Sequence, residues 1–71
     1  MAQLHSSWRT WHFGIVGEDS ALCGEEFLVA LQNATKKDAI SYAHEQFPNE
    51  KLRCYGEVSE FEADIMGLDT Y

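Results

Sequence analysis

The side chains that could do chemistry in this chain are histidines, cysteines and serines scattered along its length. Histidines and cysteines would suit a structural zinc ion, but such sites hold pairs of ligands about two to four residues apart. No pair of histidines or cysteines here has that spacing, so we expect neither a metal site nor a cofactor. The residues considered are His5, His12, Cys23, His44 and Cys54.

Nucleophilic catalysis would need a serine or cysteine in a shaped turn, with a histidine base beside it. No nucleophile turn or glycine-rich phosphate loop surrounds any of the candidates. Paired carboxylates such as Glu25 and Glu26 occur in any acidic protein, and 71 residues leave little volume for a pocket that excludes water. We predict that the chain is not an enzyme. The candidate nucleophiles are Ser6, Ser7, Cys23 and Cys54.

The most unusual stretch is residues 54–71, which contain no lysine or arginine but five acidic side chains. Large apolar residues such as Phe61 and Ile65 are interleaved with them, which a purely solvated tail would not hold. We expect an ordered acidic surface that meets a basic partner, for example by imitating nucleic-acid phosphates. The alternative is a solvated helix face that keeps the protein soluble. The acidic residues are Glu57, Glu60, Glu62, Asp64 and Asp69.

Aromatic residues form a second candidate contact surface. Tryptophan and tyrosine are common energetic anchors of protein interfaces. Trp8, His12 and Tyr55 are expected on one face of a sheet, where they would anchor a partner. The other interpretation, that Trp8 covers a sheet edge, stays open.

Two strands are expected in the first half of the chain. From Ser7 to Val16, Trp11, Phe13 and Ile15 alternate with residues of the opposite face. Gly17 to Gly24 forms a long hairpin connection, and Glu25 to Gln32 alternates again as a second strand.

A helix and a third strand follow. Thr35 and Asp38 form a variant capping box that opens a helix ending at Phe47, before Pro48. Its apolar stripe is Ala39, Ile40, Ala43 and Phe47. Lys51 to Val58 is the third strand, with Arg53, Tyr55 and Glu57 expected together on one face.

The chain then ends in a short helix from Glu60 to Met66. Ser59 and Glu62 form its capping box, and Gly67 is expected just beyond its last turn. Phe61 and Ile65, four residues apart, are expected to dock it onto the sheet. The prediction is an α+β fold: a small three-stranded, partly antiparallel sheet covered by one helix, in the order β-β-α-β, plus this acidic helix.

Composition limits the class of protein. The sequence predicts one domain over residues 1–71, with a flexible arm at 1–6. No apolar run suits a membrane span and no signal peptide is recognisable, so we expect a cytoplasmic protein with Cys23 and Cys54 as free thiols. A net charge of −7 disfavours nucleic-acid binding. A core this small usually needs an extra staple, which is a partner chain, a disulfide or a metal. Of these a partner chain is favoured, either another protein or a second copy in a homo-oligomer.

From Trp11 to Val58, the layout resembles small phage-encoded accessory proteins of β-β-α-β build, including anti-CRISPR proteins. The resemblance lies in a strand followed by the helix opening Ala34-Thr35-Lys36-Lys37-Asp38-Ala39, a passage that is also similar to HicB-type antitoxins. It implies a non-enzymatic, phage-encoded binding protein that inhibits or modulates a host complex in the host cytoplasm. The alternatives are a structural component of a virion or assembly and an antitoxin-like or regulatory subunit.

Overall fold

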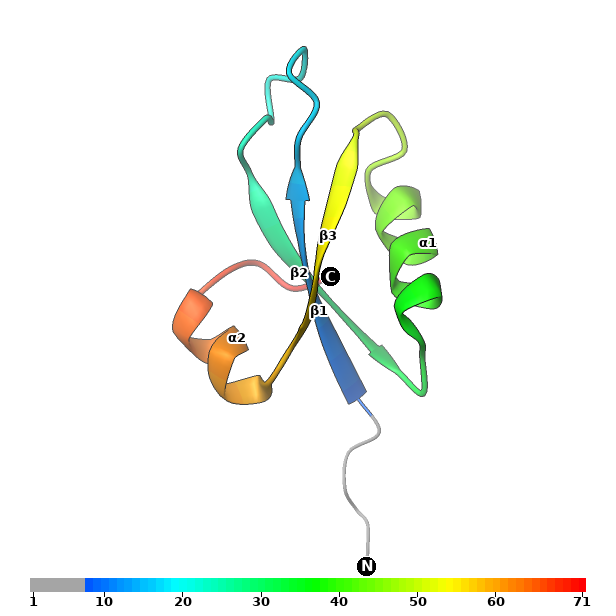
Figure 1. The fold of residues 1–71 in the computed structure, drawn as a ribbon, viewed down its shortest axis with the longest axis vertical. Coiled ribbons are helices and arrows are strands. Elements are labelled where there is room, and N and C mark those ends of the chain that lie inside the picture. Colours follow the sequence, from blue (N-terminus) through cyan, green and yellow to red (C-terminus); the bar gives the residue numbers. More distant parts are fainter. Residues whose placement is uncertain (1–7) are drawn as a thin grey trace, which may run out of the picture.

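The three strands form an antiparallel sheet in which the first strand is central (Figure 1). The computed structural model describes residues 8–71, so the predicted arm at 1–6 lies outside the described residues. The elements are β1 (Trp8–Ile15), β2 (Glu26–Gln32), α1 (Lys36–Gln46), β3 (Leu52–Val58) and α2 (Glu60–Met66). The sheet order is β2-β1-β3, and the predicted α+β fold class is confirmed.

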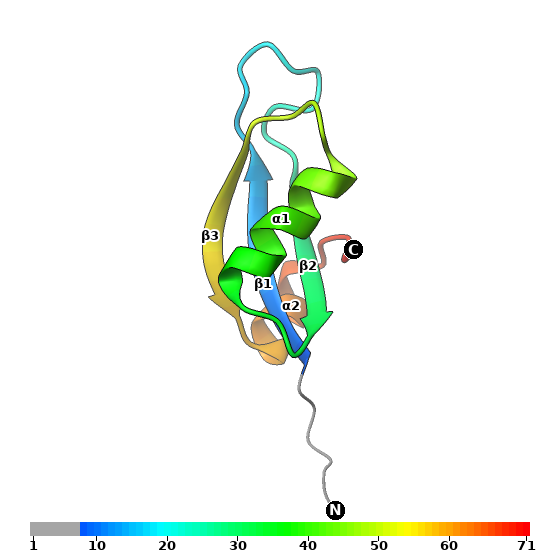
Figure 2. The same cartoon turned by 90° about the vertical axis from the view of Figure 1, so that its right-hand side faces the viewer.

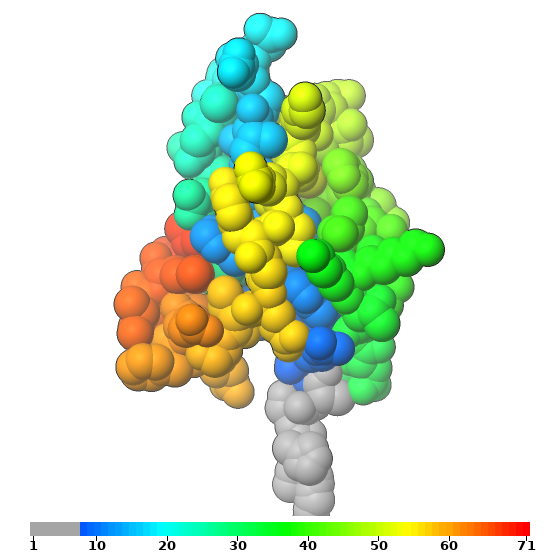
Figure 3. Space-filling view, in the orientation of Figure 1, coloured from blue at the N-terminus to red at the C-terminus, as the bar shows by residue number. Residues whose placement is uncertain are grey.

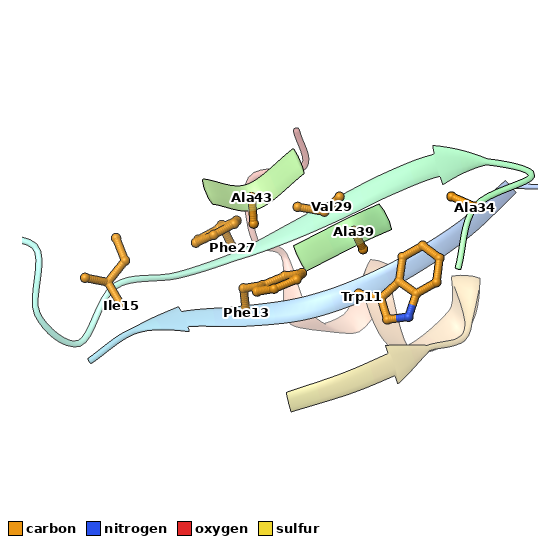
Figure 4. Packing of buried hydrophobic residues seen from close by; sticks show 8 residues of the cluster. All are labelled: Trp11, Phe13, Ile15, Phe27, Val29, Ala34, Ala39 and Ala43. Atoms are coloured by element: carbon orange, nitrogen blue, oxygen red, sulfur yellow. The ribbon is translucent and has the colours of Figure 1, made fainter. Parts of the chain in front are cut away.

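The core lies between the sheet and α1, which covers one sheet face (Figure 2). Alternate residues of β1 and β2 point to this face, as the period of a strand requires. Ala39 and Ala43 are fully buried, and their small side chains allow α1 to approach the sheet closely. Figure 4 shows the cluster, which consists of Trp11, Phe13, Ile15, Phe27, Val29, Ala34, Ala39 and Ala43.

The predicted start of α1 is confirmed. The Thr35 hydroxyl oxygen accepts a hydrogen bond from the Asp38 amide at 3.3 Å, and Asp38 Oδ2 accepts one from the Thr35 amide at 2.9 Å. Two backbone N–H groups that the first turn leaves without helical partners are thereby satisfied. At the other end, the Phe47 amide donates to the Ala43 carbonyl before Pro48 ends the helix.

A β-bulge in β3 changes which face its last residues occupy. His12 pairs with Gly56 but Phe13 pairs with Cys54, so one residue of β3, Tyr55, is extra. Gly56 has a φ of 123°, which is accessible mainly to glycine. The expectation that Glu57 shares a face with Tyr55 is therefore wrong, because Glu57 pairs with the core residue Trp11 and faces α1.

The last part of the chain crosses the other face of the sheet and attaches to the outer edge of β2. The Leu28 amide donates to the Asp69 carbonyl and the Tyr71 amide donates to the Leu28 carbonyl, both at 2.8 Å. This parallel pairing extends the sheet by a short segment, residues 69–71. Between Val58 and that segment, α2 lies on the sheet face opposite α1 (Figures 1 and 2).

The capping of α2 is as predicted, but its docking is not. Ser59 and Glu62 form a reciprocal capping box, and Gly67 ends the helix in the left-handed conformation. Phe61 and Ile65 are 73% and 69% exposed, so the prediction that they dock α2 onto the sheet is wrong. The stretch that contains α2 is fixed at both ends, because β3 precedes it and residues 69–71 pair with the edge of β2. In the resulting orientation, Ala63 is partly buried and Met66 is 37% exposed, so these two α2 residues are more shielded than Phe61 and Ile65.

Candidate partner-binding surface

The candidate site is built around two apolar side chains of α2 that point into solvent. Residues two apart lie on roughly opposite sides of an α-helix, because each residue advances about 100° around the axis. Ala63 is two residues from both Phe61 and Ile65 and is partly buried. Phe61 and Ile65 therefore project away from the body of the protein, and we call this pair the α2 stripe.

Carboxylates lie on both sides of the α2 stripe. By the same helical geometry, Glu60 and Asp64 follow one flank of it and Glu62 lies on the other. The Glu62 carboxylate caps the start of α2, because its Oε1 accepts a hydrogen bond from the Ser59 amide at 2.9 Å. Glu60 and Asp64 are exposed and lie four residues apart, one helical turn. Figure 3 shows that α2 protrudes from the rest of the molecule, so these groups are accessible to a partner.

The predicted aromatic anchors lie on the same sheet face as α2. The Tyr55 ring is 4.7 Å from the His12 ring between centroids, and His12 Nε2 lies 2.9 Å from Glu26 Oε1. Tyr55 also covers Gly14, where an added Cβ would come within 2.7 Å of the tyrosine ring. Tyr55 is 50% exposed and Trp8 is 57% exposed, so both present ring area on this face. The cluster around Tyr55 is therefore held in place and accessible.

Glu57 and Asp69 lie apart from the α2 carboxylates. Glu57 accepts two hydrogen bonds from Arg9, from Nη2 at 2.8 Å and from Nε at 3.0 Å. The Arg9 guanidinium also lies 5.2 Å from the Trp11 ring centroid, so this pair covers the core residue. Asp69 lies beyond α2, where its carbonyl accepts from Leu28 on the β2 edge. The structure therefore brings only Glu60, Glu62 and Asp64 together around the stripe.

Acidification is expected to weaken the Arg9–Glu57 pair. The hydrogen bonds from Arg9, assisted by its charge, hold the pKa of the Glu57 carboxyl below its ordinary value. A carboxylate whose pKa is lower in the folded state stabilises the fold above its unfolded pKa. That contribution is lost as the pH falls through the folded pKa. A carbon-13 NMR titration should show the Glu57 pKa returning towards its ordinary value in Arg9→Gln.

Arg53→Gln is the matched control for this titration, because Arg53 lies on the other sheet face, 6.0 Å from the Tyr55 ring centroid. The Glu57 pKa should be the same in Arg53→Gln as in the natural chain. A Glu57 pKa that does not change in Arg9→Gln would contradict the ion pair.

The cysteines and histidines do not assemble into a metal site in the described part of the chain. Cys23 is exposed in the hairpin connection and Cys54 packs half-buried against the core, both as free thiols. Within residues 8–71, no group of three or more potential ligands is placed to hold a metal ion. Of the helices in the same range, none combines the length and the hydrophobicity needed to span a membrane.

Comparisons of the chain with protein-family models, curated proteins and solved structures find no match. The functional argument therefore depends on the geometry of the surface. Sequence reasoning missed the outward direction of the α2 stripe and the role of Arg9 in holding Glu57. Gly56 could have indicated the contact between Arg9 and Glu57. An isolated glycine within a strand pattern suggests a bulge, and the bulge turns Glu57 towards Arg9.

Proposed function

We propose that this chain is a non-enzymatic protein-binding factor that contacts its partner through the α2 stripe and the carboxylates beside it. The observation that carries the proposal is the exposure of Phe61 and Ile65, 73% and 69%, on a helix whose more shielded residues are Ala63 and Met66. Exposed apolar side chains that are grouped and rimmed by polar residues mark interaction surfaces.

The charge around the stripe indicates what kind of partner it suits. Residues 54–71 contain no lysine or arginine, so α2 and the segments joined directly to it carry only acidic charged side chains. A second copy of the chain would bring like carboxylates together if it bound through the same helix, which is unfavourable. The fitting partner is a different protein with an apolar pocket rimmed by lysine or arginine side chains.

Burial of the α2 stripe would supply most of the affinity, and the carboxylates would steer the chain towards a basic partner. A fully buried Phe or Ile side chain contributes about 1.5–3 kcal/mol relative to an exposed one. Association costs offset part of this gain. Carboxylates at a rim mainly accelerate encounter with a basic partner and make it sensitive to salt. Trp8, His12 and Tyr55 would add contacts on the same sheet face.

The finer form of the proposal is a phage-encoded inhibitor of a host defence or nucleic-acid-handling complex. What supports it is the small size and acidity of the chain, and the capped helix that would hold Glu60 and Asp64 at a defined separation. Carboxylates held in this way would occupy a basic groove in place of phosphates. Identification of the partner tests this form directly.

Reversing the two free carboxylates beside the stripe is expected to weaken partner binding about tenfold or more, which equals about 1.4 kcal/mol. The variant is Glu60→Lys with Asp64→Lys, leaving Glu62 untouched because it caps α2. Attraction to a basic rim becomes repulsion in this variant. The measurement is affinity capture from cells that encode the chain, followed by binding of the captured protein at two salt concentrations.

The matched control is Glu45→Lys with Glu50→Lys, which changes the net charge equally but away from α2. The control should capture the same partner as the natural chain, and circular dichroism should show that all three proteins fold alike. If the Glu60/Asp64 variant captures the same proteins with the same salt dependence, the acidic flank does not contact the partner.

A further inference from the structure

A second, smaller site lies at the outer edge of β2, away from the α2 stripe. A pocket of about 120 Å³ opens there between the hairpin connection, the end of α1 and the C-terminal segment. Small-molecule sites are usually about 300–1,000 Å³, so a pocket of this size suits a single side chain. Its lining includes Leu22 and Phe27 in the first half of the chain and Phe47 and Tyr71 in the second.

Three aromatic rings form one wall of the pocket. The Phe27 ring lies 4.6 Å from the Phe47 ring and 5.5 Å from the Tyr71 ring, measured between centroids. Phe47 and Tyr71 meet edge to face at 5.3 Å. The backbone fixes Tyr71 there, because its amide donates to the Leu28 carbonyl at 2.8 Å and its carbonyl accepts from Ala30 at 3.2 Å. The wall is therefore preformed.

Three acidic residues also belong to the lining, Glu25, Glu26 and Asp69, and no lysine or arginine does. The Glu26 carboxylate lies 2.9 Å from the His12 ring nitrogen and is partly engaged. No hydrogen bond or ion pair within residues 8–71 engages the Glu25 or Asp69 carboxylate. The pocket thus combines an apolar, aromatic wall with two lining residues, Glu25 and Asp69, whose carboxylates have no partner within residues 8–71.

We propose that this pocket binds a lysine side chain presented by a partner protein. The four methylenes of lysine would lie against Leu22 and the aromatic wall, and its ammonium would reach Glu25 and Asp69. An ammonium has three donors on a flexible stem, which suits carboxylates from separate segments. Aromatic ring faces also attract a cation. An arginine would instead seek one carboxylate in a bidentate, planar arrangement.

The n-butylammonium ion, which reproduces the lysine side chain, tests this proposal on the full chain without any partner. In a titration followed by proton–nitrogen NMR, saturable shifts are expected at Leu22, Phe27, Phe47 and Tyr71, with a dissociation constant roughly in the millimolar range. Glu25→Gln with Asp69→Asn should weaken binding about fivefold or more, since shape is kept and charge is lost. The matched control, Glu45→Gln with Glu50→Gln, should bind as the natural chain does.

Two further ligands make the outcome decisive. 1-Butanol keeps the alkyl chain without the charge and should bind more weakly than n-butylammonium. Tighter binding of N-butylguanidinium than of n-butylammonium would contradict the proposal, because the occupant would then be an arginine. The proposal is overturned if the shifts do not saturate, if they spread equally over the α2 carboxylates, or if Glu25→Gln with Asp69→Asn has no effect. Each of these results leaves the α2 stripe untested and intact, because no partner is present.

Discussion

Replacing Trp11 with alanine is expected to lower the free energy of unfolding by about 3–5 kcal/mol. Trp11 is 1% exposed at the centre of the middle strand, and the Arg9 guanidinium covers its ring. Truncation would lose its apolar burial and leave a cavity between the sheet and α1. A single small core supplies only about 3–5 kcal/mol of stability, so this variant should be largely unfolded at 25 °C. Urea unfolding followed by circular dichroism measures the effect.

Trp8→Ala is the matched control for this variant. Trp8 lies on the same strand but on the opposite face and is 57% exposed. Surface substitutions of this kind change stability by less than about 1 kcal/mol. Equal losses of stability in Trp8→Ala and Trp11→Ala would show that the core does not lie on the α1 side of the sheet.

Replacing both members of the α2 stripe, Phe61→Ser with Ile65→Ser, is expected to weaken partner binding about 100-fold, because roughly 3 kcal/mol of apolar burial is lost. The free energy of unfolding should hardly change, since both side chains are exposed in the free chain. Loss of binding without loss of stability is the pattern of an interface and not of a core. Calorimetric titration of the captured partner and urea unfolding of the variant measure the two quantities.

His44→Ser with Glu45→Ser is the control for this second variant. Both residues are exposed on α1, so this pair introduces the same number of serines into a helix on the other side of the molecule. Partner binding should be unchanged in the control. If the Phe61/Ile65 variant binds the partner as tightly as the control does, the stripe is not the contact surface.

The elements that local patterns specify could be predicted from the sequence. The alternation of Trp11, Phe13 and Ile15 predicted β1, which ends at Ile15, one residue before the expected end. Its expected start, Ser7, lies outside the described residues. The box formed by Thr35 and Asp38 predicted the start of α1 at its first residue. The strand alternation and the capping box both involve residues close together in the sequence, and the same local interactions form in the folded protein.

The features that the sequence could not predict depend on segments far apart in the chain. The bulge at Tyr55 exists only when β3 pairs with β1, and it is this pairing that turns Glu57 towards Arg9. The outward direction of Phe61 and Ile65 also depends on contacts between segments far apart in the chain. Two apolar residues four apart mark a stripe on a helix, but the stripe faces the core or the solvent according to where both ends of the segment attach.

The attachment of the C-terminal segment also lay beyond sequence patterns. Residues 69–71 are too few to show a strand periodicity, yet they pair with β2 and bring Tyr71 to Phe27 and Phe47. This pairing fixes the far end of α2 and forms the pocket at the β2 edge. The orientation of the α2 stripe and the pocket therefore both depend on one long-range contact.

Photo-crosslinking from position 61 tests the central claim most directly. In cells that encode the chain, p-benzoylphenylalanine is placed at Phe61 in one variant and at Glu45, on the exposed side of α1, in the other. The α2 stripe as a contact surface predicts a strong crosslink from position 61 to one protein, at a pocket rimmed by lysine or arginine, and none to that protein from position 45. A partner that crosslinks from position 45 and not from position 61 would contradict it.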